Sequence, residues 1–133
     1  METQSLWPDF AIETTKSPKA ILKEQAGYLM AKTNNVLSAE VDTVQERGSI
    51  VHQFYVVAPA MNNYRYKILS VTHGVIYYPL TIEWDDNESP WEGVTTGKKT
   101  QDQDEFIKAL TQIFNDPSTV RVISSLLSQS LAE

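Results

Sequence analysis

The chain has 133 residues and a formal net charge of −6, from 17 acidic and 11 basic side chains. Hydrophobic residues make up 41% and charged residues 21%, values that predict one globular domain with a packed core. The acidic balance argues against nucleic acid and anionic membranes as partners, because clustered cations recognise both. The chain has no cysteine, which excludes disulfides, thiolate zinc sites and cysteine nucleophiles.

The first residues, METQSLWPDF, contain two acids and no apolar core, so they do not predict a signal peptide. No apolar run approaches the length of about 18 residues that a membrane span needs. We therefore expect a cytoplasmic protein. Residues 1–16 form an N-terminal arm in this interpretation, with Trp7, Phe10 and Ile12 packed against the body.

The segment from Ser17 to Asn35 predicts a helix. Ser17 is a good N-cap, and Pro18 suits the first helical position because its missing N–H does no harm there. Asn34 and Asn35 can adopt the left-handed conformation that ends a helix. The apolar residues at helical spacing are Ile21, Leu22, Ala26, Leu29 and Met30.

Four strands are expected next, at residues 36–44, 50–58, 64–72 and 75–84. Each strand follows the previous one after a short loop, which favours an antiparallel meander, because parallel pairing needs a long crossover. Pro79 cannot donate a hydrogen bond to a neighbouring strand, so it predicts that the fourth strand is bulged or lies at an edge of the sheet.

The third and fourth strands can pair in two ways, which differ in the face that the third strand buries. One arrangement places Tyr64, Tyr66 and Ile68 beside the apolar face of the fourth strand. The other places Leu69 and Val71 there, because a shift of one residue exchanges the two faces. We favour the first arrangement, since it leaves the cation that follows each tyrosine in solvent.

Residues 85–100 are polar and predict a loop, after which two helices follow. Thr100 or Asp102 can cap the first helix, while Asp116 caps the second and Pro117 begins it. The apolar stripes are Phe106, Ile107, Leu110, Ile113 and Phe114 in the first, and Val120, Ile123, Leu126, Leu127 and Leu131 in the second. The fold prediction is one α+β domain over residues 1–133, a four-stranded antiparallel meander with an N-terminal helix and two C-terminal helices on one face.

Candidate chemistry is sparse. His52 and His73 are the only side chains whose ordinary pKa lies near neutrality, and no nucleophile motif accompanies them, so we expect structural roles for both. The acidic loop fails as a calcium loop, because the position that needs glycine is Pro90. We expect no catalytic residue, no metal site and no cofactor.

Two groups of side chains are candidates for binding a partner: tyrosines on adjacent strands, and an acidic loop flanked by tryptophans. Tryptophan is enriched at interface hot spots, although cross-strand aromatic pairs and loop anchors also stabilise a fold by themselves. The candidate partner-binding residues are Tyr64, Tyr66, Tyr77, Trp84, Asp85, Asp86, Glu88, Trp91 and Glu92.

These features predict a small acidic protein-interaction domain that is a monomer or a weak homodimer, with a basic protein as the expected partner. In size, acidity and lack of a catalytic motif it resembles small bacterial inhibitors such as toxin-immunity proteins. Two alternatives stay open. One is a small-ligand or enzymatic domain that uses the interface between sheet and helices, with His52 or His73 as acid–base. The other is a structural subunit that dimerises through an edge strand.

Overall fold

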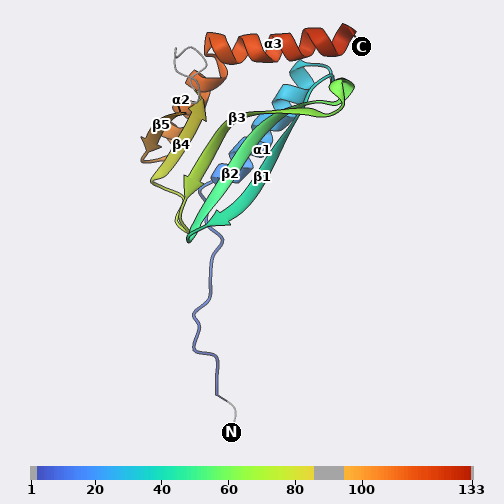
Figure 1. Ribbon diagram of the computed structural model, residues 1–133. Coiled ribbons are helices and arrows are strands. Elements are labelled where there is room, and N and C mark those ends of the chain that lie inside the picture. The colour runs from blue at the N-terminus through green and yellow to red at the C-terminus, as the bar shows by residue number, and fades with distance from the viewer. Residues whose placement is uncertain (1–2, 86–94, 133) are drawn as a thin grey trace.

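The fold is an antiparallel sheet of five strands with an N-terminal helix and two C-terminal helices (Figure 1). The computed structural model describes residues 3–85 and 95–132. In chain order the elements are α1 (Pro18–Lys32), β1 (Ser38–Glu46), β2 (Ser49–Ala58), the short 3₁₀ helix η1 (Pro59–Met61), β3 (Tyr64–His73), β4 (Leu80–Asp85), β5 (Thr95–Thr100), α2 (Gln103–Phe114) and α3 (Pro117–Ala132). The predicted α+β class and antiparallel meander are confirmed.

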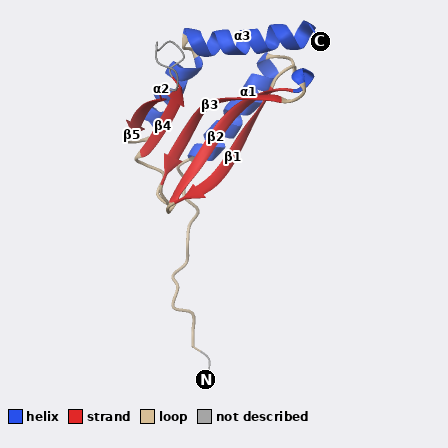
Figure 2. Ribbon diagram, in the orientation of Figure 1, coloured by secondary structure: helices blue, strands red, loops and turns tan. Residues whose placement is uncertain are grey.

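The helices share one core with one face of the sheet. Figure 2 shows α1 running behind the strands, while α3 crosses one end of the sheet. We call the face turned toward α1 and α2 the helix side, and the opposite face the outer face. The most deeply buried core side chains are Leu22, Leu37, Val56, Leu69, Val71, Leu80, Ile82 and Phe106. Within the described ranges, no helix combines the length and the apolar character needed to cross a membrane.

The sheet has a fifth strand that the sequence analysis assigned to a loop. Residues 95–100 form β5, which pairs with β4 from Leu80–Thr100 to Asp85–Thr95. The expectation that Pro79 places the fourth strand at an edge is therefore wrong, because β4 lies between β3 and β5. Pro79 lies directly before β4, so its missing N–H removes no hydrogen bond from the strand ladder.

A bulge in β3 decides which of its residues face the core. Phe54 lies opposite Leu69 and Tyr55 opposite Lys67, so Ile68 is the extra residue. Val71 lies opposite Ile82, so the favoured pairing of Tyr66 and Ile68 with β4 is wrong. The bulge nevertheless turns the residues on both sides of it, Tyr66 as well as Leu69 and Val71, toward the helix side. The cations next to Tyr66, Arg65 and Lys67, are exposed, as expected.

The predicted helix caps are confirmed. Ser17 Oγ accepts a hydrogen bond from the Ala20 N–H at 3.1 Å, and Asn34 and Asn35 end α1 with φ of 50° and 64°. Asp102, rather than Thr100, caps α2, and Asp116 caps α3. Each cap satisfies a backbone N–H group that the first turn of its helix leaves without an intrahelical partner.

The predicted buried side of α3 is only partly correct. Leu126 is buried, and Ile123 and Leu127 pack against the core. Val120 and Leu131 are 46% and 68% exposed, which contradicts the prediction. The physical reason is that α3 crosses the end of the sheet near η1 instead of lying along its face, so only part of its apolar stripe meets the core (Figure 1).

The apolar side chains of the N-terminal arm do not pack against the body. Residues 3–16 contain no helix or strand and run away from the sheet at the end opposite α3 (Figure 1). Trp7 is 78% exposed, Phe10 76% and Ile12 93%, so the predicted contact of these side chains with the body is wrong. Leu6, at 87%, is equally exposed.

Candidate functional site

A cleft of about 370 Å³ opens between the helix side of the sheet and all three helices. We refer to this feature as the cleft. Its apolar walls come from five elements and consist of Leu29, Phe54, Val56, Ile68, Phe114 and Ile123. Around them stand polar and amphipathic side chains, Gln25, Tyr28, Lys32, Thr111 and Asn115. All of these except Gln25 are exposed, so they mark the mouth of the cleft.

The cleft exists because α1 and α2 do not close over the centre of the sheet. A smaller hollow of about 60 Å³ continues the gap between the two helices, from Ile21 on α1 to Leu110 on α2. On the α2 side, the rings of Phe54 and Phe114 meet with their centroids 5.6 Å apart. The bulge at Ile68 turns this side chain toward the helix side, where it lines the cleft.

The lining of the cleft suits binding better than acid–base catalysis. A volume of 370 Å³ lies within the usual range of roughly 300–1,000 Å³ for ligand sites. Among the described residues, those that line the cleft include neither a histidine nor a carboxylate. An apolar group placed there would lose water from its own surface and from the walls, which favours association.

A small depression lies next to the cleft, where β3 and β4 diverge. Their ladder is limited to the three pairs from Ser70–Glu83 to Thr72–Thr81, so the first half of β3 separates from the end of β4. Tyr66, Trp84, Asp85 and Asp116 line this β3–β4 depression, together with Lys67 and the α2–α3 corner. Ile68 lines both features, so the depression and the cleft are neighbours.

Three of the candidate partner-binding residues therefore come together, and the others do not. Tyr66, Trp84 and Asp85 share the β3–β4 depression. Tyr64 is 49% exposed at the start of β3, and Tyr77 lies in the β3–β4 connection with its ring edge toward His73. The remaining four candidates, Asp86, Glu88, Trp91 and Glu92, lie outside the described residues.

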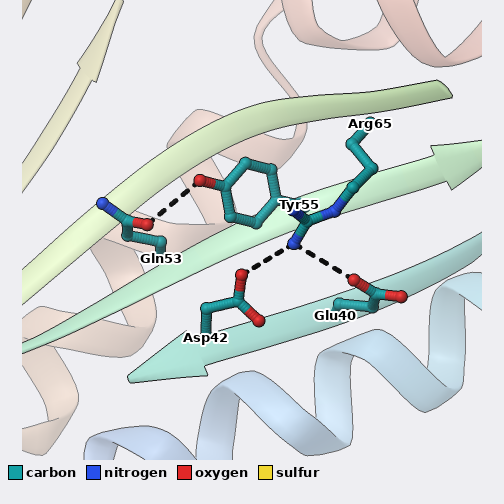
Figure 3. Close-up of polar contacts among 5 residues, drawn as sticks. All are labelled: Glu40, Asp42, Gln53, Tyr55 and Arg65. Carbon is teal, nitrogen blue, oxygen red and sulfur yellow. Dashed lines mark hydrogen bonds and ion pairs between the residues drawn. The ribbon is translucent and has the colours of Figure 1, made fainter. Parts of the chain in front are cut away.

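A polar cluster from β1, β2 and β3 lies on the outer face of the sheet. Figure 3 shows Arg65 lying over the Tyr55 ring, 4.1 Å from its centroid, with ion pairs to Glu40 at 3.1 Å and Asp42 at 2.7 Å. The Tyr55 hydroxyl donates a hydrogen bond to Gln53 Oε1 at 3.0 Å. The two carboxylates, with Tyr55, raise the pKa of the Arg65 guanidinium above its ordinary value.

The two histidines form a buried pair on the helix side. Ile50 lies opposite His73 and His52 opposite Val71, so the histidines are diagonal neighbours on adjacent strands. Their Nε2 atoms are 2.8 Å apart, and both residues are buried. Neither residue lines the cleft.

The hydrogen-bond partners fix the tautomers of this pair. Gly74 O, at 2.6 Å, can only accept, so His73 Nδ1 carries the proton and its Nε2 is the acceptor in the neutral ring. His52 Nε2–H must then donate to His73, which leaves His52 Nδ1 to accept from the Thr43 hydroxyl at 2.9 Å. All four ring nitrogens are satisfied while both rings are neutral, so the pair is a stable polar element of the core.

Protonation of His52 is unfavourable. Burial, with smaller contributions from the charges of His73 and Lys19, lowers the pKa of His52 from 6.5 to about 4. A proton on His52 Nδ1 would also require the Thr43 hydroxyl to accept instead of donate. These properties fit the expected structural role of the two histidines.

Sequence reasoning did not find the cleft. Leu29, Phe114 and Ile123 were expected as buried apolar positions, and Phe54 fell within the expected strand at residues 50–58. An apolar side chain satisfies the same pattern whether it packs against another side chain or lines an open cleft. The apolar stripe of α3 gives only an indirect signal. The stripe is longer than the part of the helix that meets the core, so some of its apolar side chains stay outside the core.

Comparisons with known proteins identify no relative: no family model, no curated protein and no solved structure matches this chain. The class of protein that the fold defines is a small α+β domain, and its function has to be argued from the geometry of its surface.

Proposed function

We propose that this protein is a protein-interaction domain whose cleft receives an apolar segment of a partner polypeptide. The observation that carries the proposal is the cleft itself, an open apolar site of about 370 Å³ enclosed by the sheet and three helices. Helices and extended peptides commonly bind in such grooves by inserting apolar anchors. Without an occupant, the partly buried side chains of Leu29, Phe114 and Ile123 keep apolar surface in contact with water at the cleft.

The chemistry around the cleft also indicates what kind of segment fits. Asp85 and Asp116 line the β3–β4 depression, which shares Ile68 with the cleft. The chain as a whole carries a net charge of −6. We therefore expect an apolar anchor followed by a basic residue, from a basic protein, because complementary charge accelerates association and selects the partner.

The proposal is tested by a substitution on α3 that changes the cleft and leaves the rest of the helix intact. Ile123→Asp places a carboxylate in the apolar wall, whereas Leu131→Asp makes the same chemical change at a site that is 68% exposed and outside the cleft. Partner capture from the native host should recover a stoichiometric protein with the wild type and with Leu131→Asp. It should lose that protein with Ile123→Asp, while circular dichroism shows that all three proteins are folded.

Three outcomes of the capture experiment lead to different conclusions. Equal capture by all three proteins would exclude the cleft as the binding site. Repeated recovery of the bare protein would count against the interaction function altogether. If the partner is an enzyme whose activity falls on binding, this protein is an inhibitor, as its resemblance in size and acidity to immunity proteins suggests.

A second candidate function, binding of a small apolar ligand, is favoured by the same cleft volume. It differs from the first in the occupant, not in the site. A ligand copurified with the wild type but not with Ile123→Asp, and identified by mass spectrometry after denaturation, would support this candidate. Capture of a stoichiometric polypeptide by a ligand-free cleft would support the first.

A further inference from the structure

We propose that the polypeptide that fills the cleft in the absence of another partner is the N-terminal arm of a second copy, inserted with Trp7 and Phe10 as anchors. The inference rests on the proposed function, since it requires that the cleft accept an apolar segment. Exchange of two arms between two copies would give a closed dimer with twofold symmetry, in which each arm fills the other copy's cleft.

The arm has the properties of an unpartnered binding segment. Leu6, Trp7, Phe10 and Ile12 are each at least 76% exposed. The rings of Trp7 and Phe10 already contact one another, with centroids 6.1 Å apart, and so form a single apolar unit. Soluble monomers rarely keep apolar groups gathered in this way on their surface, so the arm requires a place to bury them.

The position of the arm favours the cleft of a second copy over the cleft of its own chain. The base of the arm, at Glu13 and Thr15, lies against the β3–β4 connection, at the end of the sheet opposite α3 (Figure 1). The cleft lies toward the other end, between the last turns of α1 and α2 and the middle of α3. In two copies related by a twofold axis, with their sheets antiparallel, each arm would begin beside the other copy's cleft.

Local contacts hold the direction in which the arm leaves the body. Ser17 is extended, with φ of −67° and ψ of 150°, and its side chain caps α1. Lys16 is fixed by an ion pair with Glu24, 2.7 Å between Nζ and Oε1. Pro18 restricts the residue before it to extended geometry. An arm that returned along α1 to its own cleft would have to reverse its direction in the residues that precede Lys16.

The arm and the mouth of the cleft offer one pair of opposite charges. Asp9 stands between Trp7 and Phe10 in the arm, and Lys32 stands at the mouth of the cleft. Insertion of the two rings would therefore bring a carboxylate toward an exposed ammonium group. A rim pair of this kind contributes more to orientation and association rate than to affinity.

The area available is that of a small interface. An aromatic side chain buries roughly 150–250 Å², so Trp7 and Phe10 at their present exposure offer about 300 Å² per arm. Two arms give about 600 Å², and the cleft walls add less than the arms because Phe54, Val56 and Ile68 are already buried, so the two rings alone stay below the roughly 1,200 Å² of a standard specific interface. Leu6 and Ile12 of the arm, and the exposed Val75 and Ile76 beside its base, add to this area.

The absence of cysteine allows the contact to be tested directly by disulfide trapping. Ala11→Cys lies next to Phe10 and keeps both rings, and Thr111→Cys lies on α2 at the mouth of the cleft. When these two single variants are mixed and oxidised, we expect a disulfide-linked heterodimer. The matched control replaces Thr111→Cys by Lys99→Cys, an exposed position on the outer face. Docking should make the first pair react at least about tenfold faster than the control pair, since it raises the local thiol concentration.

Sedimentation of the full chain completes the test. The wild type should dimerise at micromolar concentration, and Trp7→Ala/Phe10→Ala should remain a monomer with an unchanged fold. A monomeric wild type at high micromolar concentration, or equal trapping rates at Thr111→Cys and Lys99→Cys, would overturn the inference. So would an intramolecular disulfide as the main product of a chain that carries both Ala11→Cys and Thr111→Cys.

Failure of this inference is distinguishable from failure of the proposed function. The apolar dye anilinonaphthalene sulfonate reports on the cleft itself, because it binds exposed apolar sites. If trapping and sedimentation exclude the arm, a Trp7→Ala/Phe10→Ala variant that binds the dye, and loses it on addition of Ile123→Asp, would still establish the cleft as a binding site. Dye binding that is indifferent to Ile123→Asp would count against both.

Discussion

The histidine pair makes the stability of this protein depend on pH near neutrality. His52 and His73 are buried, and all four of their ring nitrogens are satisfied while both rings are neutral. The unfolded chain binds a proton at His52 with the ordinary pKa of 6.5, whereas the folded chain does so only near 4. Between these values the unfolded state binds more protons, so the free energy of unfolding falls as the pH falls.

The magnitude follows from the two pKa values of His52. Between pH 7.5 and 5.5 the linkage relation gives a loss of about 1.3 kcal/mol, and down to pH 4 it gives about 2.9 kcal/mol. Lys19 of α1 and His73 of β3 are the charged or titratable neighbours that lower the pKa of His52 along with burial. Aspartates and glutamates with ordinary pKa values stay ionised above pH 5.5, so they contribute little in this range.

Urea unfolding at a series of pH values between 7.5 and 5.5 measures this loss. This range keeps the protein above its pI near 4.9. The control is His52→Leu/His73→Leu, which contains no histidine and should have a free energy of unfolding nearly independent of pH over the same range. A wild type with the same flat profile as the control would refute the assignment of a buried neutral pair, and so would a wild type that gains stability on acidification.

Three further predictions concern single features of the chain. Ser17→Ala removes the cap of α1 and should lower the free energy of unfolding by about 1 kcal/mol, measured by urea unfolding, with Ser17→Gly costing less. Tyr78→Phe should leave stability unchanged or raise it by about 1 kcal/mol, because the buried Tyr78 hydroxyl finds no hydrogen-bond partner among the described residues and burial raises its pKa to about 12. A marked loss of stability would show that this hydroxyl is satisfied. Charge reversal of the acidic candidates should slow association with a basic partner several-fold at low salt, as measured by surface plasmon resonance, and an unchanged on-rate would remove them from the site. These candidates are Asp85, Asp86, Glu88 and Glu92.

The partner-binding candidates show how far sequence reasoning reaches toward a site. Tyr66 was selected as a tyrosine on adjacent strands and Trp84 as a flank of the acidic loop, and the structure does place them together with Asp85. The sequence left open which face of the sheet the tyrosines occupy. The bulge at Ile68 turns Tyr66 to the helix side, and Tyr77 lies outside β4 altogether.

The fifth strand shows a limit of local patterns. Thr95–Thr100 contains a glycine and two lysines, so its composition resembles that of a loop. It forms a strand because β4 offers a complete row of backbone partners along its length. Pairing of this kind is decided by the neighbouring strand, and it carries little signal in the segment itself.

The sequence by itself determined the elements whose causes are local. Ser17, Asp102 and Asp116 cap their helices by bonds to backbone groups two or three residues away, and Asn34 and Asn35 end α1 through their own backbone preference. Short connections made the meander antiparallel for the same local reason. Only the tertiary structure decided the bulge in β3, the position of β5, the meeting of His52 with His73, and the cleft. Each of these depends on the register between strands or on the space that the helices leave uncovered. These are relations between residues far apart in the sequence, and the local spacing of residue types does not predict them.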